Sequence, residues 1–385
     1  MNILFVSNYY PSRENPQFCI FIQQQAEALI RLGHNVDVIV PVGVCHRKEK
    51  ITHEIIAGIP IYYAEYFTLY KNIYSVIALQ RNIRVLENLF DFSKYNIVSI
   101  QMFDEFTLRI FLNISNKHHI KSTVHYHGLS ILYDHPLPLE IRILQHRGDK
   151  VLKKLLHKAD AIVGVSNKVC ARVIKSVGMD NVYTVYNGVN PDLFQPSIIK
   201  YDDYTIVSVA SLKKIKGNHY LIDAVKMFLE KHKDQTIKLI LIGHGPEQEA
   251  LTALIRERNM EDIVQMIGYI AYEEVAQIVT QCDVFVMPSY YEALGCAYLE
   301  AMACRLPVIG CRYQGIDEII QDGINGFLVN PHDIYQIFER LDYLYEHPEI
   351  AEDIAQNGYD TVIENYTWLH SASRLLEVYN MILGT

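Results

Sequence analysis

Two carboxylates, Glu292 and Glu300, flank the start of a helical pattern, at a spacing that suits a ligand with two polar ends. The preceding letters CDVFVMP are mostly apolar and β-branched, as in a buried parallel strand. Good helix formers follow Gly295, so we expect a helix that begins near Leu294 or Gly295 and ends before Pro307. Glu292 then lies in a loop, and Glu300 lies about 8 Å further along the helix axis. One ligand could contact both carboxylates.

The first turn of this helix is also suited to an anion. Its backbone N–H groups lack partners within the helix and carry the positive end of the helix dipole, so a diphosphate could bind there. The backbone groups concerned belong to Ala293, Leu294, Gly295 and Cys296. A simpler interpretation stays open, in which the first carboxylate complements the helix dipole and the second is a solvated helix position.

The longer string SYYEALGCAYLEAMACRLPVIG resembles the donor-site signature of the family-4 retaining glycosyltransferases. In that signature two glutamates separated by seven residues stand beside the letters LEAMA and PVI. The likeness continues downstream in QGIDEIIQDGINGFLV. In the family the first glutamate contacts the transferred sugar and the second holds the ribose hydroxyls of the nucleotide. The resemblance therefore implies these roles for Glu292 and Glu300.

The segment VASLKKIKGNHYLIDA is similar to the family's loop in which an Arg and a Lys bind the donor diphosphate. Lys216 matches the Lys, whereas Ser211 stands at the position of the Arg. A cation here would stabilise the negative charge that grows on the departing diphosphate. The site is one cation short of the family pattern unless Lys213 or Lys214 compensates. A solvated loop lysine is the simpler alternative for Lys216.

Two glycine-containing segments complete the implied donor site. GHGPEQ matches the family's Gly-x-Gly-Pro, which implies that Gly243 lies near the nucleotide. The same segment lacks the third glycine of a dinucleotide-binding fingerprint, which argues against an NAD-linked enzyme. In MIGYI, Tyr269 is expected either to abut the nucleotide base or to pack in the core.

Residues on the acceptor side are expected in the first half of the chain. TVHYHGLS resembles the family's His-Gly pair at a strand end, which implies that His127 lies near the transferred sugar. His125 is on the same side of the strand and is the alternative, and either histidine could instead be a hydrogen-bonded core residue. The loop NYYPSRENPQFCIF resembles the family's first loop, so Phe18 and Cys19 are assigned to acceptor contact. Cys19 stands where Gly is usual, and its side chain prevents the closest backbone approach.

The composition is that of an ordinary globular protein. The chain has 385 residues, of which 50% are hydrophobic, and a net charge of −9. No long apolar run predicts a transmembrane helix, and the start MNILFV lacks the features of a secretory signal. The seven cysteines show neither a CxxC pair nor a zinc-ligand spacing, and no acidic cluster predicts a metal. We expect a cytoplasmic protein without a metal.

The net charge conceals a difference between the two halves of the chain. Residues 1–190 contain 21 Lys+Arg and 15 Asp+Glu, a balance of +6, and residues 191–385 contain 14 and 29, a balance of −15. Basic and apolar residues alternate over 139–160, which suggests a helix that meets anionic lipid at the inner face of a membrane. A core-facing helix with a solvated basic side is an equal alternative. The acidic total and the absence of a binding motif argue against a nucleic-acid partner.

Strand-like and helix-like segments alternate twice along the chain, which predicts an α/β fold with two domains. The first round runs from ILFVSN through the helix CIFIQQQAEALIRLG to ADAIVGVS, and the second runs from TIVSVAS to DVFVMPS. The Pro- and Asp-rich segment PDLFQPSIIKYDD is the expected linker. This order resembles the GT-B architecture, in which two doubly wound Rossmann-like domains face each other across a cleft. The resemblance implies an acceptor-side domain over 1–190 with a last helix over about 368–385, and a nucleotide-sugar domain over 191–367.

The resemblance as a whole implies a retaining glycosyltransferase that moves a sugar from a nucleoside diphosphate sugar to a hydroxyl of a glycan or lipid-linked acceptor, in cell-surface polysaccharide or glycolipid assembly. The expected catalytic residues are Glu292, His127 and Lys216. Backbone dipoles and a lysine replace a metal in such a scheme, and no cofactor besides the donor is expected. Two alternatives stay open: a nucleotide-sugar epimerase of the same architecture and a non-catalytic sugar-nucleotide-binding protein.

Overall fold

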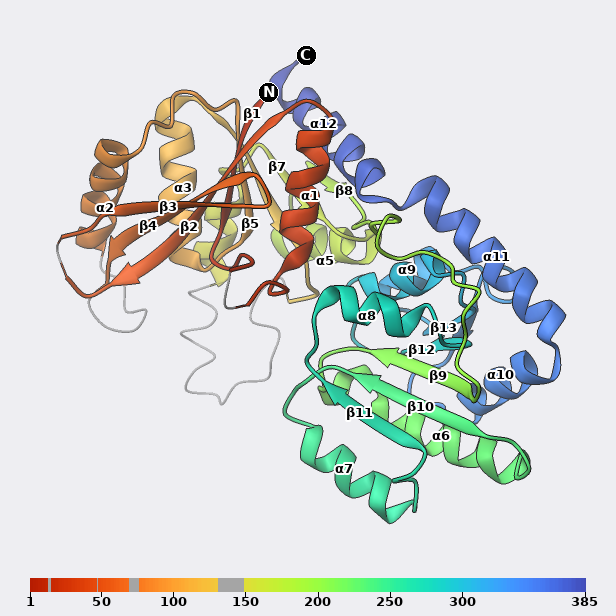
Figure 1. Ribbon diagram of the computed structural model, residues 1–385. Helices are drawn as coiled ribbons and strands as arrows, with labels where there is room; N and C mark the ends of the chain where they lie inside the picture. Colours follow the sequence, from red (N-terminus) through yellow and green to blue (C-terminus); the bar gives the residue numbers. More distant parts are fainter. Residues whose placement is uncertain (13–14, 47, 69–75, 131–148) are drawn as a thin grey trace. The chain divides into compact units, whose positions relative to one another are not determined.

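The computed structural model divides into two compact units (Figure 1). The first unit comprises Met1–Tyr186 and Trp368–Thr385, and the second comprises Asn187–Thr367. From the sequence we expect the boundary after residue 190. The structure describes residues 1–385 except 13–14, 47, 69–75 and 131–148, and for residues 76–78 it describes the backbone alone.

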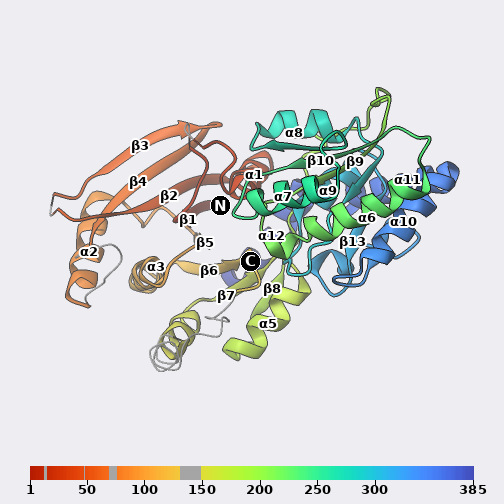
Figure 2. The same cartoon turned by 90° about the horizontal axis from the view of Figure 1, so that it is seen from below.

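The first unit is built around an eight-stranded sheet in the order β3-β4-β2-β1-β5-β6-β7-β8 (Figures 1 and 2). Alternate residues of its central strand β1 are buried on opposite faces: Ile3 and Phe5 join one core cluster, and Leu4 points to the other side. Burial on both faces is why the strand is a continuous apolar run in the sequence. The strands are β1 (Asn2–Ser7), β2 (Asn35–Val44), β3 (Ile51–Ile56), β4 (Ile59–Phe67), β5 (Ile97–Met102), β6 (Lys121–Tyr126), β7 (Ala161–Gly164) and β8 (Val182–Thr184).

One edge of this sheet departs from the parallel pairing of its other strands. Strand β3 pairs antiparallel with β4, and the two strands are joined by a two-residue turn at Ala57 and Gly58. Both turn residues have positive φ, 51° and 79°, as a tight hairpin requires. Alanine rarely adopts this conformation, so the letters AG give a weaker turn signal than Asn-Gly would. The sequence therefore did not indicate the hairpin.

Helix α12, from the end of the chain, completes the core of the first unit. It lies beside α1 (Figure 1), and its Trp368 and Tyr379 are 6% and 0% exposed. The Tyr379 hydroxyl is 2.9 Å from the Ser99 hydroxyl on β5, so the helix is also joined to the sheet by a buried hydrogen bond. The helices of this unit are α1 (Ile20–Arg31), α2 (Val76–Leu89), α3 (Glu105–His118), α5 (Asn167–Val177) and α12 (Trp368–Leu383), with a further helical stretch over 149–156.

The second unit contains a six-stranded parallel sheet in the order β11-β10-β9-β12-β13-β14. Its strands are β9 (Tyr204–Val209), β10 (Ile237–Ile242), β11 (Val264–Gly268), β12 (Val284–Val286), β13 (Val308–Cys311) and β14 (Phe327–Val329). Because all strands run the same way, the loops after β9, β10, β11 and β12 meet at one edge of the sheet. The helices are α6 (Asn218–Lys231), α7 (Gln248–Glu257), α8 (Tyr272–Val279), α9 (Cys296–Ala303), α10 (Ile334–Glu346) and α11 (Pro348–Asn365), with 3₁₀ turns η1 (Lys214–Lys216) and η2 (Gly315–Glu318).

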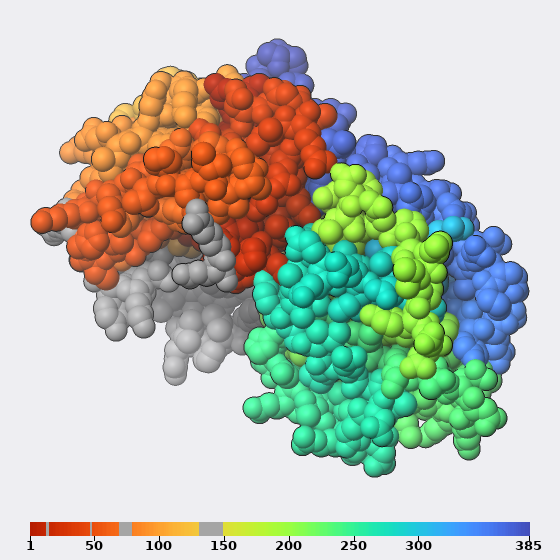
Figure 3. Space-filling model, viewed as in Figure 1, coloured from red at the N-terminus to blue at the C-terminus, as the bar shows by residue number. Residues whose placement is uncertain are grey.

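The predicted linker is a surface segment of the second unit. Residues 191–203, yellow-green in Figure 3, run over this unit and are joined by hydrogen bonds to the segment before β12. The Thr280 hydroxyl donates to the carbonyl of Gln195 (2.5 Å), and the Lys200 ammonium donates to the carbonyl of Cys282 (2.7 Å). These bonds give the segment a fixed course despite its high content of Pro and Asp.

The basic stretch over 139–160 lies partly outside the described residues, which resume at 149. In the described part, Leu155 and Leu156 are buried, whereas Lys150, Lys154 and Lys158 are exposed. This is the arrangement of a core-facing helix with a solvated basic side, the simpler of the two interpretations of the sequence. No helix in the described part of the chain is long and apolar enough to cross a bilayer.

Candidate active site

The loop between β12 and α9 carries the first predicted carboxylate. Gly295 caps α9 with a φ of 88°, a left-handed conformation that glycine adopts without strain. The helix therefore begins where the sequence predicts. The Ala293 amide donates to the Glu292 carboxylate (3.1 Å), so one of the four predicted anion-binding amides already has a partner. Glu292 lies in the loop before Gly295, and its carboxylate accepts this bond from the backbone of that loop.

The loops that follow β9 and β12 are packed against each other and bring a cation to Glu292. A Cβ added to Gly217 would lie 2.4 Å from the Pro288 carbonyl oxygen, so only glycine allows this approach. The Lys216 ammonium forms an ion pair with the Glu292 carboxylate, and the two side chains are 17% and 14% exposed. Lys216 is therefore not a solvated loop lysine. The two residues are distant in sequence, and the sequence did not reveal that they pair.

Glu300 lies in the second turn of α9 and is only 8% exposed, so its interpretation as a solvated helix position is wrong. The Tyr272 hydroxyl donates to Glu300 Oε1 at 2.6 Å. Burial raises the pKa of Glu300 to about 7, and the hydrogen bond from Tyr272 acts in the opposite direction. A carboxylate that titrates near neutrality is a common feature of functional sites. Tyr272 was not identified from the sequence.

The loops after β9, β10 and β11 interlock beside these residues. Gly243 has a φ of 140°, and its amide donates to the Gly268 carbonyl (2.8 Å). A Cβ on Gly243 would lie 1.9 Å from the Ala210 carbonyl oxygen. Ser211 is exposed, as is Tyr269 at 59%, so the alternative that Tyr269 packs in the core is wrong. The loops thus place Ser211, Gly243 and Tyr269 at the same sheet edge as Lys216 and Glu292.

We expect Gly243→Ala to destabilise the protein by about 2–3 kcal/mol, because it combines an unfavourable φ with a backbone clash. Gly268→Ala is the matched control: Gly268 also has positive φ, 85°, but no atom lies within 4 Å of its added Cβ. The control should therefore lose only about 1 kcal/mol. Thermal unfolding of the two variants measures the difference, and equal losses would show that the loops do not interlock as described.

A second group of predicted residues lines a cavity of ≈ 420 Å³ in the first unit, at the carboxyl ends of β5 and β6. His127 Nε2 is 2.8 Å from Gln101 Oε1, and because a carbonyl oxygen only accepts, Nε2 carries the proton. Nδ1 is then an acceptor, and it is buried without a partner among the described residues. The Tyr126 hydroxyl, on the same cavity wall, is also buried and has no partner in the part of the chain that the structure describes. Two such groups in one cavity point to a ligand that carries hydrogen-bonding groups.

The two histidines differ in their environment. His125 Nε2 lies 2.9 Å from the Ser99 hydroxyl and 3.1 Å from the Thr123 hydroxyl, so this ring is a hydrogen-bonded core residue that also reaches the cavity wall. Burial lowers the pKa of His127 to about 3 and places the pKa of His125 well below its usual range. Both imidazoles are consequently neutral at physiological pH.

Phe18 and Cys19 are not among the described residues that line this cavity. Phe18 is 45% exposed and packs against Tyr9 with ring centroids 5.3 Å apart. Cys19 caps α1 with a φ of 56°, the conformation for which glycine is usual, and burial raises its pKa to about 11. Phe21 instead contacts His127, with ring centroids 4.6 Å apart. The helical position of Phe21 gave no sign of this contact.

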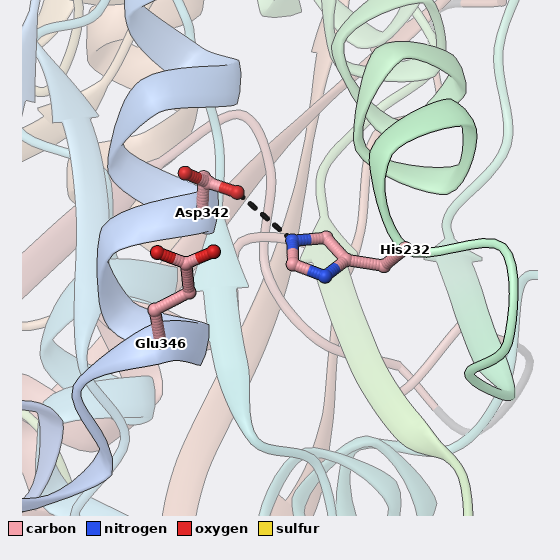
Figure 4. A group of neighbouring side chains, drawn as sticks. All are labelled: His232, Asp342 and Glu346. Carbon is pink, nitrogen blue, oxygen red and sulfur yellow. Dashed lines mark hydrogen bonds and ion pairs between the residues drawn. The ribbon is translucent and has the colours of Figure 1, made fainter.

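One group of side chains in the described residues has a geometry that could hold a metal ion: His232, Asp342 and Glu346 (Figure 4). His232 Nε2 is 2.9 Å from Asp342 Oδ1, and the Lys231 ammonium is 2.7 Å from Asp342 and 2.8 Å from Glu346. Both carboxylates are therefore already paired with the Lys231 ammonium. His232 directly follows the last residue of α6, whereas Lys216 lies just before the first residue of the same helix. The length of α6 therefore separates this group from the donor-side residues.

Two family models match the chain. The model described as Glycosyl transferases group 1 matches residues 189–361, and the model described as Glycosyltransferase Family 4 matches residues 20–193. An uncharacterized glycosyltransferase of Methanocaldococcus jannaschii is 31% identical over 217 residues, which cover 53% of this chain and 55% of the relative. The alpha-D-kanosaminyltransferase of Streptomyces kanamyceticus is 28% identical over 182 residues, 47% of each chain. The chain thus spans about half the length of these curated relatives.

Solved structures of glycosyltransferases share the fold over the whole chain. Sucrose-phosphate synthase from Thermosynechococcus elongatus superposes with a TM-score of 0.78 at 20% identity and covers 100% of this chain and 99% of its own. The Anabaena protein HepE, solved in complex with UDP-glucose, gives a TM-score of 0.73 at 17% identity, with 99% and 100% coverage. At these identities the likeness shows the fold alone. The predicted α/β class with two Rossmann-like domains of the GT-B type is confirmed.

Proposed function

Because the chain belongs to the family-4 type of GT-B glycosyltransferases, we propose that it transfers a sugar from a nucleoside diphosphate sugar to an acceptor hydroxyl, with retention of anomeric configuration. The observation that carries the proposal is the collection of Lys216, Glu292 and Glu300 in the second unit, around the loops at the carboxyl ends of its strands. The structures of HepE with UDP and with UDP-glucose support a sugar nucleotide as the donor.

In this proposal each donor-side residue acts on a different part of the nucleotide sugar. Lys216 and the start of α9 stabilise the diphosphate as it leaves, where negative charge grows in the transition state. Glu300 accepts hydrogen bonds from the ribose hydroxyls. Glu292 holds the transferred sugar, and its negative charge stabilises the positive charge that develops at the anomeric carbon. The departing phosphate takes the proton of the acceptor hydroxyl.

The cavity of the first unit is proposed to receive the acceptor. His127 Nδ1 and the Tyr126 hydroxyl offer an acceptor and a donor to neighbouring hydroxyl groups of a glycan or of a lipid-linked oligosaccharide. His127 positions the acceptor as a neutral hydrogen-bonding group, since a pKa of about 3 makes it a weak base. Such acceptors fit a role in cell-surface polysaccharide or glycolipid assembly, in the cytoplasm beside the membrane. No metal and no further cofactor takes part.

The proposal is tested by a thermal-shift screen of sugar nucleotides followed by a product assay with EDTA present. A donor at 100 times its Kd adds about 2.7 kcal/mol of stability. We expect slow hydrolysis of the stabilising donor, and faster release of nucleoside diphosphate when glycan or lipid-linked acceptors are added. Interconversion of the sugar without nucleotide release would instead identify an epimerase. Binding without any turnover would identify a non-catalytic sugar-nucleotide-binding protein.

We expect His127→Ala to lower kcat/KM for the acceptor about 10-fold and to leave donor affinity unchanged, because the imidazole acts in the first unit. The wild-type pH profile should show no inflection from this imidazole between pH 5 and 9, since its pKa is about 3. His127→Gln, which keeps an accepting oxygen, should retain more activity than His127→Ala. An inflection near pH 6.5 that disappears in His127→Gln would contradict a neutral role. His157→Ala, at an exposed histidine, is the control.

A further inference from the structure

A tyrosine outside the implied donor residues contacts the buried carboxylate of Glu300. Tyr272 is the first residue of α8, and its hydroxyl donates to Glu300 Oε1 at 2.6 Å. The two residues come from different helices, so the bond depends on how α8 and α9 are placed within the second unit. An ionised carboxylate that is 8% exposed is stable only when hydrogen bonds replace its lost water. The tyrosine hydroxyl supplies such a bond.

The tyrosine ring is itself held in place. It packs edge-on against Phe194, with ring centroids 5.2 Å apart and an interplanar angle of 66°. Phe194 is 1% exposed, and its amide donates to the Asn190 carbonyl at 3.0 Å. Phe194, near the start of the second unit, therefore holds the Tyr272 ring in place, and the ring in turn sets the position of the Tyr272 hydroxyl. A phenol anchored in this way orients a carboxylate more strictly than a solvated side chain would.

We propose that Tyr272 is a positioning residue for donor binding: it holds one oxygen of the Glu300 carboxylate and leaves the other oxygen to the ribose hydroxyls of the nucleotide. This proposal rests on the proposed donor role of Glu300. Because Tyr272 donates, it stabilises the carboxylate in its ionised form, which is the form that accepts two hydroxyl hydrogen bonds. Tyr272 thus sets the pH range over which the donor binds.

The charges around Glu300 support this consequence. Its neighbours are Tyr272 on α8, Cys296 on α9 and Cys304 at the C-cap of α9. Burial raises the pKa of both thiols to about 12, so both thiols are neutral between pH 6 and 9. Glu300, with a pKa of about 7, changes charge in that range. Loss of the Tyr272 hydroxyl removes the hydrogen bond that lowers the pKa of Glu300, so this carboxyl group should ionise at higher pH.

The test measures nucleotide affinity against pH in wild type and Tyr272→Phe. The probe is whichever of UDP, GDP, ADP and dTDP binds wild type most tightly, and its Kd is measured by calorimetry from pH 6 to pH 9. We expect Tyr272→Phe to bind about 5–10-fold more weakly at pH 7, with the midpoint moved up by about one pH unit and the affinity largely recovered at pH 9. At saturating donor, kcat should be unchanged.

Tyr63→Phe is the matched control, because the Tyr63 hydroxyl also donates to a glutamate, Glu54 Oε1, at 2.6 Å, in the first unit. It should leave both Kd and midpoint unchanged. Phe194→Leu, which keeps the hydroxyl but loosens the ring, should move the midpoint in the same direction by less, and it serves as the test if Tyr272→Phe does not fold. An unchanged midpoint in a folded variant overturns the role of Tyr272, even if affinity falls equally at every pH.

The proposed function can fail separately from this inference. If Glu300→Gln leaves nucleotide affinity and its pH dependence as in wild type, the donor role of Glu300 is wrong, and the role of Tyr272 is wrong with it. If Glu300→Gln weakens binding but Tyr272→Phe does not shift the midpoint, the donor role stands and the inference about Tyr272 alone is overturned. The double variant should bind like Glu300→Gln.

Discussion

Replacing Lys216 by alanine is expected to lower kcat about 10²–10³-fold while the protein remains folded. The Arg position of the family pattern is occupied by the exposed Ser211, so Lys216 is the principal cation proposed for the leaving diphosphate. It is 17% exposed and held against Glu292, so its charge acts at a place where water screens little. Stabilisation of the leaving group is realised in the transition state, so kcat should fall more than donor affinity.

Single-turnover measurements of the rate at which the sugar is cleaved from the nucleoside diphosphate test this expectation. Lys216→Arg keeps the charge and should recover part of the rate, although a planar guanidinium does not place its charge at the same point. Lys213→Ala and Lys214→Ala are matched controls, since both lysines are exposed in the same loop and should change the rate less than about twofold. If either control loses as much activity as Lys216→Ala, that lysine replaces the Arg that is missing at Ser211. Lys216 is then not the principal cation for the leaving diphosphate.

Glu300→Ala is expected to weaken binding of the nucleoside diphosphate about 10–150-fold above pH 8. A buried carboxylate that accepts two hydroxyl hydrogen bonds contributes about 1.5–3 kcal/mol, which corresponds to this loss. The loss should shrink as the pH falls below 7, because wild type is then protonated at the same position. Calorimetric titration at pH 6 and pH 8.5 measures the difference. A loss of equal size at both pH values would show that the charge of Glu300 does not matter for binding.

The Glu300 carboxyl should affect folding stability in the opposite sense to nucleotide binding: its ionisation strengthens binding but lowers the free energy of unfolding. Its pKa of about 7 lies above the ordinary value of 4.5, so the fold favours the protonated form. This stabilisation is complete below pH 4.5 and is lost as the pH rises through 7, at most by about 3 kcal/mol. Without ligand, Glu300→Gln should therefore resist unfolding better than wild type at pH 8.5 and equally well at pH 4.5. Glu249→Gln, at an exposed helix position, is the control and should show no such pH dependence.

The parts of the donor site that lie close together in sequence could be predicted from the sequence. The start of α9 was expected at Leu294 or Gly295, and the helix begins at Cys296 with Gly295 as its cap. Glycine before a run of helix formers, after an apolar strand, is a signal contained within a dozen residues. The alternation of strands and helices was likewise readable, because buried parallel strands are apolar throughout.

The contacts that define the site chemically could not be predicted in the same way. Lys216 meets Glu292 across 76 positions, and Tyr272 meets Glu300 across 28. Neither pairing follows from local periodicity, because each depends on which loops the sheet order brings together. The burial that raises the pKa of Glu300 is also a tertiary property, and from sequence alone a helical glutamate is expected to be solvated.

The placement of α12 has a consequence for the order in which the protein forms during synthesis. The residues that fill one face of the first unit, Trp368 and Tyr379 among them, are translated after the whole of the second unit. A ribosome releases the chain from its beginning, so the second unit can collapse while the first still lacks a buried helix. The unit whose synthesis begins first is completed last, because α12 supplies part of its core cluster.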